Sequence, residues 1–300
     1  MTGRVKVQCP LCNSNQSFDL TNFFSSKDAP ISICKRCSLV FLNPRHSDEW
    51  YKSYYKGSTS REKDNNRSDI EDYESKQYEI KGKSVLKFIM NNYDLQLNRM
   101  KVLEIGCTSG GILRYFRDSG ASSVTGVDPE KEYVDYANNI SGIDVFDGYL
   151  DEFCNKNKDS FNLIIMRHVL EHLFEPLVNL ELVYSLLDDN GILFIETPSL
   201  YSMGITDRWK ENIHVEHPVI YSNKTLECML KKCNFDIIAR PNNGNRGHLR
   251  FLVKKNINGQ MDFNYGSWIK VLILLIAYEL STPLRKFYYF FRKSIGFKKT

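Results

Sequence analysis

Apolar residues follow two alternating patterns through the central part of the chain, from Ser84 to Lys255. Apolar positions at helical spacing occur in residues 84–93, 111–120, 131–140, 177–191 and 224–234. Short strand-like runs occur in residues 101–107, 123–128, 143–148, 161–166, 192–198, 235–241 and 248–255. Helices that alternate with fully apolar strands predict an α/β fold with a mostly parallel sheet covered on both faces.

The last two predicted strands have no helix between them. An Asn- and Gly-rich stretch, residues 242–247, joins them and is typical of a turn. We therefore expect an antiparallel hairpin at one edge of the sheet.

Three further segments flank this predicted domain, which we assign to residues 83–255. Residues 1–45 hold two Cys-x-x-Cys pairs in polar, turn-forming sequence and predict a small metal-binding module. Residues 46–82 are rich in Tyr, Lys, Ser and Asp and show little apolar periodicity, which we interpret as a linker that becomes helical towards Tyr73. Residues 256–300 form a basic, aromatic tail.

Composition narrows the class of protein. With 300 residues, of which 42% are hydrophobic, the chain suffices for one full-sized domain with smaller attachments. The formal net charge of +4 disfavours a nucleic-acid footprint over the whole surface. No apolar stretch follows the basic residues of the N-terminus, so we expect a cytoplasmic protein, with its eight cysteines acting as metal ligands or core residues.

Four of these cysteines have the spacing of a zinc site. Cys9, Cys12, Cys34 and Cys37 form two Cys-x-x-Cys turns with 21 residues between them. Four thiolates complete a tetrahedral zinc site and leave no coordination position for water, so we expect a structural Zn²⁺. The other four lack paired spacing, and we expect them to pack in the core (Cys107, Cys154, Cys228 and Cys233).

A glycine-rich turn follows the first strand of the predicted sheet. The sequence VLEIGCTSGG places Gly106 and Gly110 between a strand and a helix, where free backbone N–H groups can approach a ligand. Glu104 precedes this turn, and Asp128 ends the next strand, where a carboxylate can accept hydrogen bonds from ribose hydroxyls.

These motifs resemble those of class I S-adenosylmethionine-dependent methyltransferases, which have a Rossmann-like sheet. The resemblance implies that the turn holds the methionine part of S-adenosylmethionine and that Asp128 binds its ribose. Thr108 replaces a glycine common in the family, which an ordinary backbone conformation at Thr108 would accommodate. After Gly148 the chain has Tyr149 and Leu150 in place of the acidic residue that contacts adenine in many members. The cofactor residues expected from the motifs are Glu104, Gly106, Cys107, Thr108, Gly110, Asp128, Pro129, Tyr149, Leu150 and His168.

Binding of a nicotinamide dinucleotide is the competing use of this architecture. That cofactor favours a G-x-G-x-x-G turn, whereas residues 106–111 read GCTSGG. The motifs further along the chain also favour methyl transfer.

The sequence HVLEHL, followed by a proline, comes directly after the fourth strand. It resembles a branch of small-molecule methyltransferases that includes sugar and polyprenyl-quinone enzymes. The resemblance implies that His168 lies near the cofactor and His172 near the transferred methyl group. The two histidines share a face if a helix begins at His168. Packing of the helix is the alternative role of His172.

A second histidine cluster, NIHVEHPVIY, lies after the fifth strand. It is similar to the Tyr-His-Glu-His-Phe stretch of zinc-containing sugar C-methyltransferases, in which the Glu-His pair serves acid–base chemistry. The resemblance assigns His217 as the base and Glu216 as the residue that orients it, while His214 falls where that family has Tyr. Because His titrates near neutral pH, it suits proton removal during methyl transfer. Packing of a substrate loop is the alternative.

The tail combines apolar and basic sequence. From Gly266 onward it has seven Lys or Arg residues against one Glu, around the eight-residue apolar run 271–278. A bilayer span takes about 20 residues, so this run is too short to cross a membrane. We expect either a helix that lies on the inner surface of the membrane or a helix packed on protein.

The function expected from these features is methylation, on oxygen or carbon, of a small-molecule, sugar, sugar-nucleotide or glycan acceptor. One alternative is a zinc- and S-adenosylmethionine-binding module without turnover in glycan assembly. A nucleic-acid methyltransferase is disfavoured because motifs for flipped bases are absent from the sequence. The acceptor, the methylated atom and the oligomeric state stay open.

Overall fold

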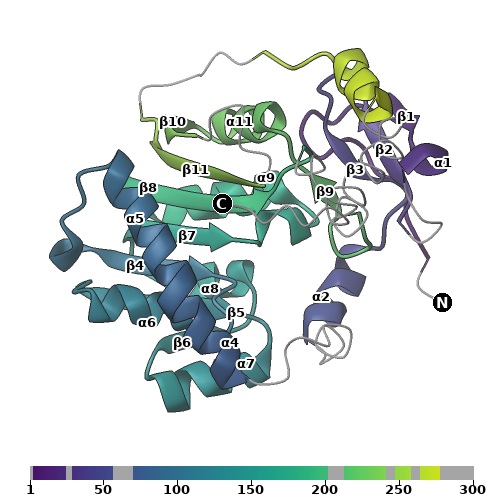
Figure 1. Ribbon diagram of the computed structural model, residues 1–300. Helices are drawn as coiled ribbons and strands as arrows, with labels where there is room; N and C mark the ends of the chain where they lie inside the picture. The colour runs from purple at the N-terminus through teal and green to yellow at the C-terminus, as the bar shows by residue number, and fades with distance from the viewer. Residues whose placement is uncertain are drawn as a thin grey trace, which may run out of the picture.

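A computed structural model describes residues 3–24, 29–56, 70–201, 213–240, 247–257 and 264–277 of the chain. A seven-stranded sheet forms its centre (Figure 1). Its strands are β4 (Lys101–Ile105), β5 (Ser123–Asp128), β6 (Asp144–Asp147), β7 (Phe161–Arg167), β8 (Leu187–Pro198), β10 (Phe235–Ala239) and β11 (His248–Lys255). The strand order is β10-β11-β8-β7-β4-β5-β6. Only β11 runs against its neighbours, so the predicted mostly parallel sheet with an antiparallel edge hairpin is confirmed.

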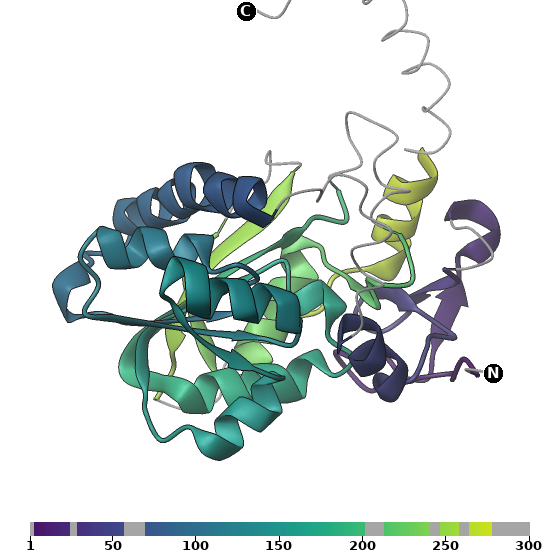
Figure 2. The same cartoon turned by 90° about the horizontal axis from the view of Figure 1, so that it is seen from below.

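Helices cover both faces of this sheet (Figures 1 and 2). One face packs against α5 (Lys83–Asn92), α6 (Gly111–Asp118) and α7 (Lys131–Tyr136). The opposite face packs against α8 (Leu150–Lys156), α9 (Pro176–Leu186) and α11 (Asn223–Lys232). Alternate strand residues, such as Ile164 and Ile165 on β7, enter opposite cores. This burial on both faces explains why the central strands β4 and β7 are mostly apolar.

Short helical segments complete the domain. They are α4 (Ile70–Lys76), the π-helix η1 (Gln77–Gly82), the 3-10 turn η2 (Leu97–Arg99), the π-helix η3 (Ala137–Ser141) and the 3-10 turn η4 (Leu170–His172). α4, η1 and α5 follow one another directly and lie across the face of the sheet (Figure 1).

A second, four-stranded sheet contains the N-terminal cysteines. Its strands are β1 (Ser17–Asp19), β2 (Ile31–Cys34), β3 (Val40–Leu42) and β9 (Val219–Ile220), with α1 (Thr21–Phe24) beside it. β9 comes from the segment after β8, so the N-terminal module and the large α/β domain share this sheet. Val219 and Ile220 of β9 are buried against β3, so the segment that carries the second histidine cluster also contributes to a core.

The described residues of the predicted linker are largely helical. They contain α2 (Asp48–Lys56), which buries Tyr51 and Tyr54 between the module and the large sheet (Figure 1). α4 and η1 then pack on α6. Residues 57–69 lie outside the described parts.

The tail begins as a helix over residues 268–277 that packs on the N-terminal module (Figures 1 and 2). Val271 and Leu275 enter the same core as Ile31 and Ile33 of β2. Packing on the chain's own module therefore accounts for one face of this helix. None of the helices in the described parts of the chain reaches the length and apolar content that a membrane span requires.

Candidate active site

The glycine-rich turn joins β4 to α6 through residues with positive φ. Gly106, Thr108 and Gly110 have φ values of 70°, 49° and 76°. The Thr108 N–H donates to Oδ2 of Asp128 at 2.8 Å, and the Thr108 hydroxyl donates to the Cys107 carbonyl. The expectation of an ordinary backbone at Thr108 is wrong, because these hydrogen bonds hold it in the left-handed region. Strain of this kind is concentrated at functional sites.

Asp128 ends β5 and is buried next to this turn. Its Oδ1 accepts the N–H of Glu130 at 2.9 Å while Oδ2 accepts that of Thr108. Each carboxylate oxygen has two lone pairs, so the fixed carboxylate can still accept hydrogen bonds from a diol such as the ribose of a nucleoside.

A pocket of about 840 Å³ lies at the carboxyl ends of the strands. This volume is in the range of small-molecule and cofactor sites. Most of the predicted site residues line it, namely Gly106, Thr108, Asp128, Pro129, Tyr149, Leu150, His168, His172, His214 and Glu216.

The other predicted cofactor residues support the turn from behind. Glu104 is buried on β4, and burial raises the pKa of its carboxyl group well above 4.5. Cys107 is buried beside Gly126, and Gly110 caps the N-terminus of α6. Glu104, Cys107 and Gly110 are not among the residues that line the pocket, and their contact with the cofactor stays a prediction.

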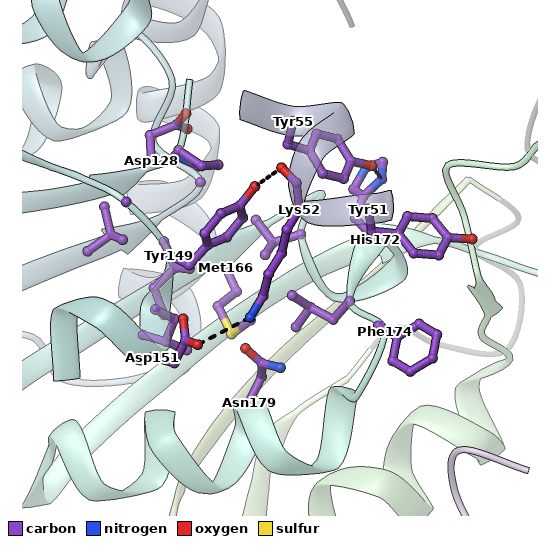
Figure 3. Close-up of a pocket in the computed structure, with 18 of the residues that line it drawn as sticks. Tyr51, Lys52, Tyr55, Asp128, Tyr149, Asp151, Met166, His172, Phe174 and Asn179 are labelled. Atoms are coloured by element: carbon purple, nitrogen blue, oxygen red, sulfur yellow. Dashed lines mark hydrogen bonds and ion pairs between the residues drawn. The ribbon is translucent and has the colours of Figure 1, made fainter. Parts of the chain in front are cut away.

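Helix α2 forms one wall of the pocket (Figure 3). The Tyr149 hydroxyl donates to the Lys52 carbonyl at 2.5 Å, and the Lys52 ammonium lies 3.3 Å from Asp151. These contacts tie α2 to the N-terminus of α8. Tyr51 and Tyr55 on the same helix also line the pocket.

Three histidines lie together, and two of them, His172 and His214, line the pocket, whereas His217 is not among its lining residues. The His172 ring lies 4.6 Å from that of His217, which in turn lies 3.9 Å from that of His214. Nδ1 of His172 lies 2.9 Å from the Glu216 carbonyl and 2.6 Å from the Tyr55 hydroxyl. Because a carbonyl oxygen only accepts, Nδ1 carries the proton of the neutral ring, and Nε2 is its basic nitrogen.

The helix expected to begin at His168 is absent. His168 has a φ of 54°, and only the short turn η4 follows, so the two histidines are not related by regular helical spacing. Both histidines still line the same pocket.

Glu216 contacts two other groups of the site. Its carboxylate accepts a hydrogen bond from the Tyr54 hydroxyl and lies 3.9 Å from Nδ1 of His214. Burial and then the Glu216 charge raise the pKa of Tyr55, so this hydroxyl stays protonated at neutral pH. The predicted orientation of His217 by Glu216 stays a prediction.

Glu171 lies buried beneath the histidines. Its carboxylate accepts from Nδ1 of His168 at 3.0 Å and from the Thr197 hydroxyl at 2.9 Å. Burial alone would raise its pKa, but the His168 hydrogen bond and the charges of His168, His172 and His217 lower it to about 2. A fixed negative charge therefore lies behind the histidine cluster.

The four module cysteines also form a cluster. All four are buried, and their sulfur atoms lie within 4.8 Å of one another. The Cys9 and Cys37 sulfurs are 3.4 Å apart, and those of Cys12 and Cys34 are 3.5 Å apart. Zn–S bonds of about 2.3 Å in a tetrahedron require sulfurs about 3.8 Å apart, so the residues fit a zinc ion.

The sequence analysis missed the part that α2 plays in the site. Lys52 and the tyrosines at positions 51, 54 and 55 come from the segment interpreted as a linker. The available signal was the spacing of Trp50, Tyr51, Tyr54 and Tyr55, which places aromatic rings on one side of a helix.

Comparison with known proteins decides the family. Residues 75–240 match the family model described as a methyltransferase domain, which is more than half of the chain. The chain belongs to this family. Its central domain is a class I S-adenosylmethionine-dependent methyltransferase domain.

Curated relatives match over shorter stretches. The chain is similar to the mitochondrial ubiquinone biosynthesis O-methyltransferase of Rattus norvegicus, with 31% identity over 109 residues, covering 34% of this chain and 31% of that protein. It is also similar to the ubiquinone biosynthesis O-methyltransferase of Actinobacillus pleuropneumoniae, with 32% identity over 106 residues, covering 32% of this chain and 45% of that protein. The methyltransferase chain thus spans less than half the length of these relatives.

Among solved structures, magnesium protoporphyrin IX methyltransferase from Synechocystis with bound SAH has a similar fold. The TM-score is 0.52 at 14% identity, over 70% of this chain and all of that one. At this identity the similarity shows the fold alone.

Proposed function

We propose that this methyltransferase transfers the methyl group of S-adenosylmethionine to oxygen or carbon of a small-molecule acceptor, such as a sugar, a sugar nucleotide or a glycan. The observation that carries the proposal is that Asp128, the glycine-rich turn and His172 all line the same pocket. It joins a nucleoside-binding carboxylate to a cluster of proton-accepting groups. The O-methyltransferase names of the curated relatives support oxygen as the atom methylated.

The proposed reaction needs a base because the acceptor hydroxyl or carbon acid loses a proton as it attacks the methyl group. His217 is assigned as the base, next to His172 and His214. The buried Glu171 carboxylate stabilises the positive charge that His217 gains. Tyr55 and the Glu216 carbonyl orient the His172 ring.

The metal in this proposal is structural. Cys9, Cys12, Cys34 and Cys37 would hold Zn²⁺ through four thiolates, which leaves no position for a substrate. The zinc would stabilise the module from which α2 extends over the pocket.

Calorimetric titration with S-adenosylmethionine tests the cofactor part of the proposal. We expect the wild-type chain to bind and Asp128→Ala to bind about tenfold more weakly or worse, because a carboxylate hydrogen bond is worth about 1.5–3 kcal/mol. Asp144→Ala removes an exposed carboxylate at the start of the next strand and should bind as the wild type does.

If the folded, zinc-loaded wild-type chain does not bind S-adenosylmethionine, the proposed enzyme function is wrong. The alternative function, a binding module without turnover, is then favoured. If it binds, acceptors are screened by methyl transfer. His217→Asn should then abolish turnover while it retains cofactor affinity.

A further inference from the structure

One arginine of the N-terminal module is buried against the wall of the active-site pocket. Arg45 follows β3, is 4% exposed, and exchanges two backbone hydrogen bonds with Val5. Its side chain reaches out of the module: Nη2 donates to the Phe174 carbonyl at 2.9 Å, and the guanidinium lies 3.8 Å from the centre of the Phe174 ring. Phe174 lines the pocket and Arg45 does not, so Arg45 supports the pocket wall from outside.

Stability alone does not account for this arginine. Burial lowers the pKa of Arg45 to about 10, so its guanidinium is still charged at neutral pH. Nε and Nη1 have no hydrogen-bond partner among the described residues. A buried charge with unpartnered N–H groups costs free energy that an apolar side chain of similar length would not cost. Departures from favourable packing of this kind are expected where a residue serves a functional site.

The segment that Arg45 contacts continues directly from the histidine cluster. Phe174 lies two residues after His172, in the connection between η4 and α9. Leu173, Phe174 and Glu175 all line the pocket. A shift of the Phe174 main chain would therefore move the adjoining His172.

Tyr51 connects Phe174 to the second histidine segment. The two rings pack together with their centroids 6.2 Å apart, and the Tyr51 hydroxyl donates to the Val215 carbonyl at 2.8 Å (Figure 3). Burial raises the pKa of Tyr51 to about 12, so the hydroxyl keeps its proton at neutral pH. Val215 adjoins Glu216, whose carbonyl accepts from Nδ1 of His172. Phe174 and Tyr51 thus join the two segments whose hydrogen bond fixes the tautomer of His172.

We propose that Arg45 is a positioning residue of the methyl-transfer site, which acts through Phe174 and Tyr51 to hold the His172 ring toward the methyl acceptor. The contacts do not depend on the reaction, whereas the role in methyl transfer rests on the proposed function. Groups that take part in chemistry must be held within about 0.5 Å of their productive positions by supporting contacts of this kind. The N-terminal module thereby contributes to the site through a residue that is neither a cysteine nor part of α2.

Arg45→Met is the test variant, because it removes the charge and the hydrogen bond to Phe174 but keeps a long side chain. Arg45→Lys keeps a positive charge next to the Phe174 ring and should restore the wild-type behaviour. Arg99→Met removes an exposed arginine of η2 and is the matched control. The measurement is nitrogen-15 NMR of the histidine rings in the full-length, zinc-loaded chain, which distinguishes the two neutral tautomers and is assigned with His172→Gln. Calorimetry with S-adenosylhomocysteine is carried out on the same samples.

We expect the Nδ1–H tautomer of His172 alone in the wild type, Arg99→Met and Arg45→Lys, and a mixture of both tautomers in Arg45→Met. The affinity for S-adenosylhomocysteine should stay unchanged. With an acceptor found by screening, Arg45→Met should lower kcat about tenfold or more at unchanged KM for S-adenosylmethionine, since a displacement of about 1 Å can cost about 100-fold in rate.

If the His172 signals of Arg45→Met equal those of the wild type while its thermal midpoint falls, Arg45 only stabilises the fold and the proposal is overturned. If Arg45→Met does not fold, Tyr51→Phe decides, because it removes only the hydrogen bond to Val215; a single His172 tautomer in Tyr51→Phe contradicts the proposal. If the wild type does not bind S-adenosylhomocysteine, the proposed function fails, and the tautomer measurement still decides whether Arg45 positions His172.

Discussion

His168 combines an uncommon backbone conformation with two ionic contacts. It has positive φ at the tip of β7, and its ring nitrogens face Glu171 and Glu196. Burial alone would lower its pKa, but the hydrogen bonds to the two carboxylates outweigh burial and raise it above 6.5. Protonated His168 therefore stabilises the folded protein.

This pKa shift predicts a pH dependence of stability. A raised pKa in the folded state gives a contribution that is complete below pH 6.5 and is lost as the pH rises through the folded pKa. The free energy of unfolding, measured with urea between pH 6.5 and about 8.5, should fall less in His168→Gln than in the wild type. His46→Gln is the control, because burial lowers the pKa of His46 and its titration lies below this range. Equal falls in wild type and His168→Gln would contradict the assigned charge.

Sequence alone located most residues of the site but not their mutual contacts. Gly106, Asp128 and His168 lie at the carboxyl ends of strands, and parallel strands bring these ends to one edge. Thr108 shows the limit, because its positive φ results from a hydrogen bond to Asp128, 20 residues away. Tyr55 could not be assigned because its partner His172 is 117 positions away.

At the scale of elements, close helix packing depends on small residues. A Cβ atom added at Gly111 would lie 2.6 Å from the Glu74 carbonyl oxygen. α6 thus begins in direct contact with the backbone of α4. Because this neighbour is main chain, it cannot move aside as a flexible side chain would.

Gly111→Ala should therefore destabilise the protein. Overpacking of this kind costs about 1–3 kcal/mol, which urea unfolding would detect. Gly3→Ala is the control, because its added Cβ would meet nothing within 4 Å. Unchanged stability of Gly111→Ala would show that α4 shifts without cost.

The elements that sequence predicted best are those whose apolar pattern is local. β7 and residues 192–198 of β8 are buried and mostly apolar, so their sequences alone define them. The start of β8 was predicted wrongly, because residues 187–191 belong to the strand and not to the helix predicted over residues 177–191. β9 has two residues, and its identity as a strand depends on its pairing with β3. α2 is rich in tyrosine and in charged residues. Its role as a wall of the pocket depends on its contacts with Tyr149 and His172, which are distant in the sequence.

At the scale of the whole molecule, the cysteine module and the methyltransferase domain share one core. The four cysteines belong to the same hydrophobic cluster as Leu226 and Met229 of α11. The Lys232 ammonium donates to the Leu11 carbonyl at 2.8 Å. Loss of the proposed metal should therefore affect more than the N-terminus.

We expect the purified chain to contain zinc and to lose stability when a chelator removes it. Cys34→Ser should lower the zinc content and the thermal midpoint of unfolding, because metal binding contributes to folding free energy. Cys154→Ser changes a half-buried thiol outside the cluster and should match the wild type in both measurements. A metal-free wild-type chain of full stability would exclude a structural zinc.

The C-terminal tail predicts a second property of the whole molecule. The helix over residues 268–277 leaves Ile269, Ile273 and Leu274 more than half exposed, at 52%, 59% and 56%. The sequence that follows, residues 278–300, carries six Lys or Arg residues against one Glu. Apolar and basic groups in succession are typical of binding to an anionic membrane surface.

In sedimentation with phosphatidylserine-containing vesicles at low salt, the full-length chain should bind and high salt should release it. The double variant Arg292→Glu, Lys293→Glu should bind more weakly, because each basic residue contributes about 1 kcal/mol near such a surface. Lys156→Glu, Lys158→Glu changes two exposed lysines elsewhere and serves as the control. If the folded wild-type chain does not bind the vesicles, the membrane prediction is wrong and the tail helix serves only to pack on the N-terminal module.

The pairing of β9 with β3 has a consequence for synthesis on the ribosome. On the edge of β3 that faces away from β2, Val40 and Phe41 pair with Ile220 and Val219. Domains generally fold as units while the chain emerges from its N-terminus. One edge of β3 therefore stays unpaired until β9 and most of the chain have been translated. The cysteine module is thus completed among the last parts of the fold, although its cysteines are translated first.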